Sequence, residues 1–114
     1  MQERPTSQAG TDYLYVLVCR DISQPHLSVQ VAHAAIAATH AFHEYFEDKP
    51  HPHLVVCGVT DESELLREFN LLKEMGVPCC LWREDDLGNR ATSLATAPLR
   101  GKARKPLSGY SLLR

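Results

Sequence analysis

Long apolar runs are missing from the 114-residue sequence, and its first dozen residues are polar, with no cleavable apolar region. A membrane-spanning helix needs about 18 or more consecutive apolar residues, so we expect neither membrane insertion nor secretion. A large excess of charge is also missing, because 12 Lys and Arg residues against 14 Asp and Glu residues give a net charge of −2. A nucleic-acid partner would therefore need a local basic patch.

Paired cysteine motifs are missing as well. The four cysteines, Cys19, Cys57, Cys79 and Cys80, form no C-x-x-C pair, and each lies in an apolar run typical of a strand. Free cysteine behaves as a small buried hydrophobe. We therefore predict core thiols of a cytoplasmic protein rather than disulfides or zinc ligands.

Composition and length favour one folded domain. Hydrophobic residues make up 44% of the sequence and charged residues 23%, as in ordinary globular proteins. Residues 1–11 offer almost nothing to bury, so we interpret them as a flexible tail and residues 12–114 as the domain.

Apolar patterning predicts alternating strands and helices. Buried strands are expected over residues 13–19, 53–59, 78–82 and 92–97. Pro25 can open a helix whose apolar face recurs for about five turns, through Phe46. A second helix is expected from Thr60, as its N-cap, to Gly76. This order predicts an α/β fold whose sheet is mostly parallel where helices make the crossovers.

Three polar residues share one edge of the first predicted helix, next to its apolar face: His26, Gln30 and His33. Open α/β sheets bind ligands where a strand ends and the next helix begins. Glu84, in the acidic loop 84–86, would lie at the same end of the sheet if its strand is parallel to the first. The alternatives are that Gln30 and His33 satisfy loop backbone groups and that the acidic loop is a solvated turn.

Metal binding is not expected, although the sequence has six histidines. Only His40 and His43, three residues apart, could bind one metal together, and no third ligand lies near them in sequence. We therefore predict neither a metal nor another cofactor.

Basic residues cluster at the C-terminus without an acidic residue among them. They are Arg100, Lys102, Arg104, Lys105 and Arg114. This cluster indicates either a solvated, loosely ordered tail or an arm that follows a phosphate backbone.

Four segments together resemble the type II peptidyl-tRNA hydrolase family, over roughly residues 13–114. These segments are VLVCRD from Val16, QVAHAA from Gln30, EMGVPCCLW from Glu74 and ATSLATAP from Ala91. The resemblance implies a single-domain α/β sandwich with a four-stranded mixed sheet flanked by helices. It also implies hydrolysis of the ester that joins a peptide to the 3′ end of tRNA.

The resemblance carries functional positions onto this chain. Gln30 and His33 match the family's first-helix motif, Thr92 matches a threonine of the last strand, and Glu84 stands where the family has a catalytic aspartate. The family's lysine falls on His26. With tRNA or peptidyl-tRNA as the implied partner, a set of cations is predicted to bind RNA: Arg20, Arg100, Lys102, Arg104 and Lys105. A homodimer is left open.

Two functions are compatible with these residues. In the enzyme hypothesis, Glu84 or His33 activates a water, and Thr92 positions water or substrate. The oxyanion is then stabilised by Gln30, by helix N-terminal amides or by protonated His26. In the alternative hypothesis, the chain is an inactive family member that binds RNA, a nucleotide or a protein partner.

Overall fold

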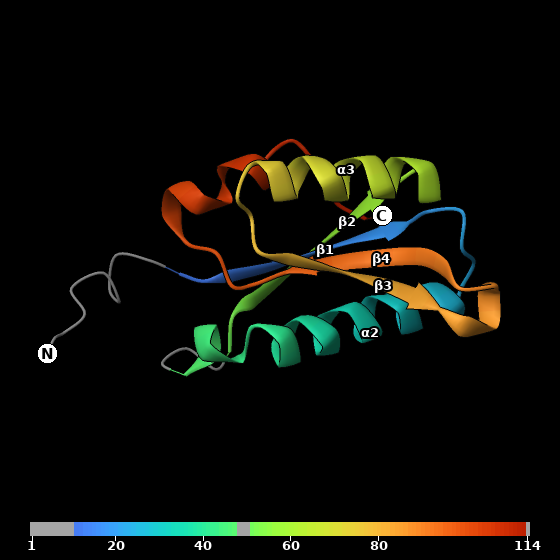
Figure 1. Cartoon of the computed structure of the whole chain (residues 1–114), viewed down its shortest axis with the longest axis horizontal. Helices are drawn as coiled ribbons and strands as arrows, with labels where there is room; N and C mark the ends of the chain where they lie inside the picture. The colour runs from blue at the N-terminus through green and yellow to red at the C-terminus, as the bar shows by residue number, and fades with distance from the viewer. Residues whose placement is uncertain (1–10, 48–50, 114) are drawn as a thin grey trace, which may run out of the picture.

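The computed structural model describes residues 11–47 and 51–113, in which a four-stranded sheet lies between two helical layers (Figure 1). The strands are β1 (Tyr13–Cys19), β2 (His53–Val59), β3 (Cys79–Glu84) and β4 (Arg90–Thr96). The α-helices are α2 (His26–Ala41) and α3 (Glu62–Glu74). Short 3₁₀ helices are η1 (His43–Phe46), η2 (Asp85–Leu87) and η3 (Gly101–Leu107). The predicted α/β class is confirmed, while the tail predicted at the N-terminus lies almost wholly outside the described residues.

The sheet is mixed, with strand order β2-β1-β4-β3. Strands β1 and β2 are parallel, whereas β4 is antiparallel to both of its neighbours. The resemblance implied such a mixed sheet. Strands joined by an α-helix, β1 to β2 and β2 to β3, run in the same direction, as the sequence predicted for such crossovers. A connection as short as the one between β3 and β4 joins antiparallel strands, and β4 then pairs with β1 as well.

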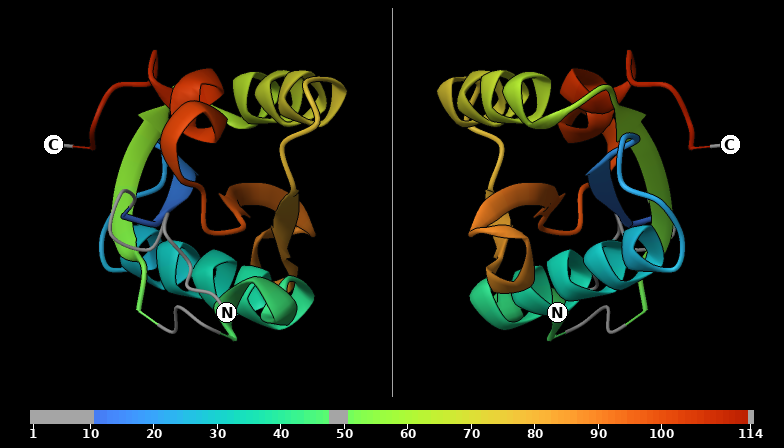
Figure 2. Two further views of the ribbon diagram at one scale, coloured as in Figure 1. Left: turned by 90° about the vertical axis from the view of Figure 1, so that its left-hand side faces the viewer. Right: turned by 90° about the vertical axis from the view of Figure 1, so that its right-hand side faces the viewer.

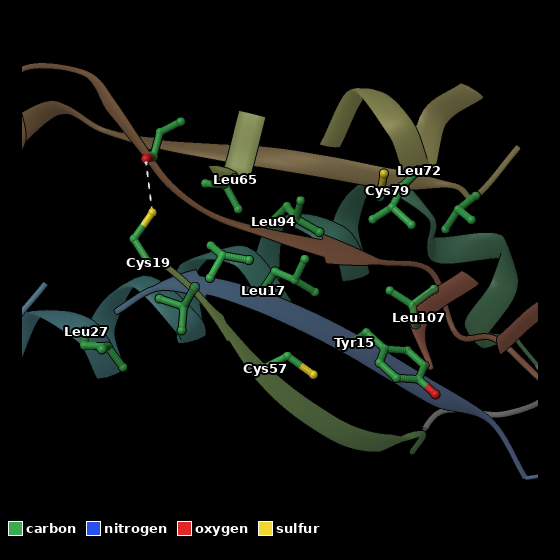
Figure 3. Close-up of a cluster of buried hydrophobic side chains, with 14 of the residues drawn as sticks. Tyr15, Leu17, Cys19, Leu27, Cys57, Leu65, Leu72, Cys79, Leu94 and Leu107 are labelled. Atoms are coloured by element: carbon green, nitrogen blue, oxygen red, sulfur yellow. Dashed lines mark hydrogen bonds between the residues drawn. The ribbon is translucent and has the colours of Figure 1, made fainter. Parts of the chain in front are cut away.

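Helix α2 covers one face of the sheet, and α3 together with η3 covers the other (Figure 2). The α3 side holds the larger core, in which Leu17, Leu65 and Leu94 are fully buried (Figure 3). The α2 side packs small residues such as Ala34, Ala38 and Ala95. Small side chains allow a helix to approach a sheet closely, which places polar groups of α2 within reach of the strands.

Both predicted helices differ from the structure at one end. Helix α2 ends at Ala41, because the backbone of Phe42 leaves the helical region with φ −117° and ψ 38°. The apolar pattern continues only as η1, where Tyr45 is exposed. The N-cap of α3 is Asp61 instead of Thr60, since the Asp61 carboxylate accepts from the Glu64 amide at 3.0 Å. Aspartate is a better N-cap than threonine.

The strand cysteines are free thiols, as predicted. Cys19, Cys57 and Cys79 are buried and Cys80 is partly buried. Burial raises the pKa of all four thiols, and that of Cys79 to about 11.

Over the described ranges, no helix is long and apolar enough to cross a membrane. The same residues contain no cluster of three or more side chains suited to a metal.

The C-terminal region is folded, which excludes the loosely ordered tail for residues 100–113. After η3, the Gly58 amide donates to the Ser111 carbonyl at 3.0 Å, and the Leu113 amide donates to the Val56 carbonyl at 2.9 Å. These bonds and a bridge between Cys57 and Leu112 cover the outer edge of β2 at residues 56–58. This part of the edge cannot pair with another chain.

Candidate functional site

Gln30 lies at the centre of the candidate site, in the second turn of α2, and is only 2% exposed. Its Nε2 donates to Oε1 of Glu84 at 3.0 Å, and its Oε1 accepts from the Thr92 hydroxyl at 2.7 Å. An ionised carboxylate can only accept hydrogen bonds, so the amide must turn its NH₂ group toward Glu84. Helix α2, β3 and β4 therefore meet through one side chain.

A β-bulge in β4 explains how Thr92 reaches Gln30. Trp82 pairs with Ser93, but the next residue of β3, Arg83, pairs with Ala91, so Thr92 is skipped. Neighbouring residues of a regular strand point to opposite faces. Here the bulge turns both Thr92 and Ser93 toward α2, where the Ser93 hydroxyl donates to the Gln30 carbonyl at 2.9 Å. Bulges re-aim side chains in this way.

Glu84 ends β3 and keeps 14% of its side chain exposed. Besides the bond from Gln30, its Oε2 accepts from the Asp86 amide at 3.3 Å. The Gln30 bond, followed by the Asp86 bond, lowers the pKa of Glu84 below its ordinary value, and Trp82 and His33 contribute less. Hydrogen bonds to a carboxylate favour its charged form. Glu84 is therefore an anion at neutral pH.

His33 is the second outward-facing group, with 42% of its side chain exposed. Its Nε2 lies 4.0 Å from Oε1 of Glu84. Its ring stacks on the Trp82 indole, with centroids 4.5 Å apart and planes within 12°. The stack limits how the imidazole can turn, so Trp82 orients His33 beside the carboxylate.

Trp82 and Ser93 are site residues that the sequence analysis missed. Trp82 is the single tryptophan of the chain, but its position in an apolar run indicated only a core residue. Its Nε1 is buried and has no hydrogen-bond partner of acceptable geometry within the described part of the chain. Among the signals in the sequence, only its distance of two residues from Glu84 could have suggested a role at the site.

The site thus has a floor and a rim. The floor consists of Gln30, Thr92 and Ser93, which are buried and bonded to one another. The rim consists of His33, Trp82 and Glu84. Because Thr92 is 0% exposed, only the rim can meet a substrate in this conformation.

His26 stands apart from these residues. It is exposed at the first position of α2, one turn before Gln30, and its side chain makes no hydrogen bond or ion pair within the described ranges. Asp85 and Asp86 are also exposed, and Asp86 serves the site through its backbone amide. The structure therefore links Gln30, His33, Glu84 and Thr92 to one another, whereas His26 lies one helical turn before Gln30 without a hydrogen bond to any of them.

Three of the predicted RNA-binding cations contact groups of the chain itself. Arg20 covers Gly58, where an added Cβ would lie 2.4 Å from the guanidinium Nε, and it donates to the Leu112 carbonyl at 3.3 Å. Arg100 binds both carboxylate oxygens of Asp12 at 3.1 Å. Arg104 donates to the Tyr15 hydroxyl at 2.8 Å.

Comparison with known sequences identifies the family. The model of the family described as "Peptidyl-tRNA hydrolase PTH2" matches residues 13–109. The chain belongs to this family. The match covers β1 through η3 and therefore includes every residue of the floor and the rim. No curated protein matches the chain significantly.

A solved structure shares the fold. It is that of a protein of unknown function from Agrobacterium tumefaciens strain C58, with a TM-score of 0.61 and 15% sequence identity. The alignment covers 90% of this chain and 98% of the other. At this identity the similarity supports the fold alone.

Proposed function

We propose that this member of the peptidyl-tRNA hydrolase PTH2 family hydrolyses the ester between a peptide and the 3′ end of tRNA. Family membership supports a tRNA-linked substrate in general. The observation that carries the proposal is that the ionised, largely buried carboxylate of Glu84 lies 4.0 Å from the exposed ring of His33. A carboxylate beside an imidazole is a common arrangement for activating a nucleophile.

His33 is the proton acceptor in this mechanism. Imidazole is the side-chain base best matched to neutral pH, whereas the lowered pKa of Glu84 makes its carboxylate a weak base. A water attacks the ester carbonyl and gives a proton to His33, and Glu84 stabilises the imidazolium. The imidazolium then returns the proton to the tRNA oxygen as the bond between carbonyl carbon and ester oxygen breaks. Peptide acid and tRNA hydroxyl are the products.

Several possible donors to the oxyanion already donate hydrogen bonds within the protein, which leaves fewer candidates. The Gln30 side chain is occupied by Glu84 and Thr92. Two amides in the first turn of α2 are also occupied: Leu27 donates to the Ser23 carbonyl, and Ser28 to Gln24 Oε1. Of the donors that the sequence suggested, His26 at the exposed start of α2 remains. His26 is accordingly the proposed donor to the oxyanion.

Multiple-turnover hydrolysis of an N-acylated aminoacyl-tRNA tests the proposal. Wild-type protein should turn over, with or without a chelator, because no step uses a metal. Glu84→Gln keeps the shape of the side chain but removes the charge, and should reduce kcat by roughly a hundredfold or more. Asp85→Asn is the matched control, since it removes an exposed neighbouring carboxylate, and it should behave like wild type.

Two results would contradict the proposal. One is wild-type turnover no higher than the uncatalysed rate, which would favour an inactive binding protein. The other is a Glu84→Gln variant as active as Asp85→Asn, which would show that the charge of the carboxylate has no part in the reaction.

A further inference from the structure

A second polar region, away from the candidate site, lies where η3 meets β1 and β2. It is a groove of about 740 Å³. Three cations line it, Lys102, Arg104 and Lys105, together with Tyr15, Tyr110 and several apolar residues. No acidic side chain lines it among the described residues. We call it the basic groove.

Arg104 is held in place before any ligand arrives. Its Nε donates to the Tyr15 hydroxyl at 2.8 Å, and its guanidinium lies 3.6 Å from the centre of the Tyr13 ring. Its terminal nitrogens make no hydrogen bond to the described part of the chain. A guanidinium fixed on an aromatic face loses little entropy when it binds an anion. Arg100 differs, because its guanidinium is bound to Asp12.

Lys102 and Lys105 add two cations on one side of η3. They are exposed and form no ion pair with the residues that the structure describes. In a 3₁₀ helix, residues three apart lie one above the other, so both ammonium groups project from the same side. Like charges placed together repel each other, and an anion relieves this repulsion. In a chain of net charge −2, the grouping marks a local site for anions.

The basic groove and the candidate site lie at opposite ends of the sheet and on opposite faces. The groove adjoins η3, on the α3 face near the start of β1, whereas Glu84 ends β3 on the α2 face (Figure 1). The groove lies over β1 and β2, whereas Glu84 belongs to β3 at the other edge of the sheet. A small substrate cannot touch both places, but a folded RNA can.

We infer that the basic groove binds backbone phosphates in the RNA part of the substrate, remote from the ester. This inference rests on the proposed function, because that function identifies the RNA as tRNA. The binding of phosphate does not depend on that function, because the fixed guanidinium and the two lysines can bind phosphate oxygens of any RNA. The groove then contributes affinity for tRNA, while the floor and the rim carry out the hydrolysis.

Charge removal at the groove gives the test. Lys102→Ala combined with Lys105→Ala is compared with Arg67→Ala combined with Lys73→Ala, which removes two exposed charges from α3. Binding of deacylated tRNA is measured by fluorescence anisotropy across a salt series. The groove variant should bind tRNA roughly tenfold more weakly than wild type at about 0.1 M salt. The slope of log binding constant against log salt concentration should become less steep by about 1.4 to 1.8. The control variant should match wild type in both.

Hydrolysis kinetics separate this inference from the proposed function. The groove variant should raise KM on full-length peptidyl-tRNA but leave kcat/KM unchanged on a short 3′-terminal oligonucleotide that carries the same ester. If wild type hydrolyses neither substrate but the groove variant still binds tRNA more weakly, the proposed function is wrong and the inference about the basic groove is supported. Equal tRNA affinity and salt slope for the groove variant and the control would overturn the groove assignment. Unchanged melting temperatures would show that both variants are folded.

Discussion

The floor and the rim of the candidate site differ in how they use their polar atoms. In the floor, the hydroxyls of Thr92 and Ser93 both donate to Gln30, and all three residues are buried. In the rim, His33 is 42% exposed and its Nε2 is 4.0 Å from Glu84, beyond hydrogen-bond distance. The polar groups of the floor thus satisfy one another without a ligand, whereas those of the rim can still bind one.

This difference assigns different roles to residues that belong to one motif. Gln30 and His33 are three positions apart on α2, and the sequence resemblance treats both as functional. Under the proposed function, Gln30 is a positioning residue that acts through Glu84, because it is buried. The exposed ring of His33 is the group proposed to touch the substrate. Substitutions in the floor should therefore act through the geometry and pKa of Glu84.

Among the substitutions that test the difference between floor and rim, Gln30→Met should have the largest effect on stability and turnover. Met fills a similar volume but donates no hydrogen bond, so the Thr92 hydroxyl loses its acceptor and Glu84 loses a donor. A buried hydroxyl without a partner costs about 1–3 kcal/mol of unfolding free energy. The pKa of Glu84 should rise toward its ordinary value, and kcat should fall roughly tenfold to a hundredfold as the carboxylate shifts. Denaturant unfolding, a ¹³C titration of Glu84 and turnover measure the three effects.

The sign of the pH dependence follows from the lowered pKa of Glu84. Stability from such a carboxylate is present above its unfolded pKa and is lost as pH falls through its folded pKa. The stability gap between wild type and Gln30→Met should therefore be widest near neutrality and narrow in acid. Thr92→Val is the control, because it removes the donor to Gln30 but keeps the bond to Glu84. An unshifted Glu84 pKa in Gln30→Met would contradict the role of the floor.

Trp82→Leu probes the rim and should have an intermediate effect. Leucine removes the stacked partner of His33, and a stacked ring pair contributes about 0.5–1.5 kcal/mol. We expect kcat to fall roughly threefold to tenfold with KM little changed, since the ring of His33 is no longer held beside Glu84. Trp82→Phe keeps an aromatic face and should restore most of the activity. Equal losses in the Leu and Phe variants would show that stacking does not position His33.

Most of the fold could be predicted because strand and helix patterns are local. Strand β1 is buried on both faces, so its apolar run indicated a central strand. The position of β4 between β1 and β3 could not be predicted in this way. It depends on which strand edges pair after the chain collapses, and the apolar runs of all four strands look alike.

Which residues form the candidate site was easier to predict than the place of each residue in its floor or rim. Spacing and resemblance identified Gln30, His33, Glu84 and Thr92, which the structure brings together. The burial of Gln30 depends on Thr92, which is 62 residues away and turned inward by a bulge that no glycine or proline marks. Trp82 became part of the rim only because α2 places His33 against it. Such contacts between distant elements leave no periodic signal.

His26→Lys should have the smallest effect, and it tests whether the site extends beyond the rim. His26 is exposed, and solvent screens an exposed cation strongly, so a gain or loss of charge there should change kcat by only about twofold to threefold. If the side chain of His26 donates to the oxyanion, His26→Lys should keep turnover close to that of wild type, because lysine can also donate at this position. His26→Ala, which removes the donor, should lose activity by that factor. Identical turnover of wild type, His26→Lys and His26→Ala would exclude the His26 side chain from catalysis, and the oxyanion would then need a donor other than the side chains of His26 and Gln30.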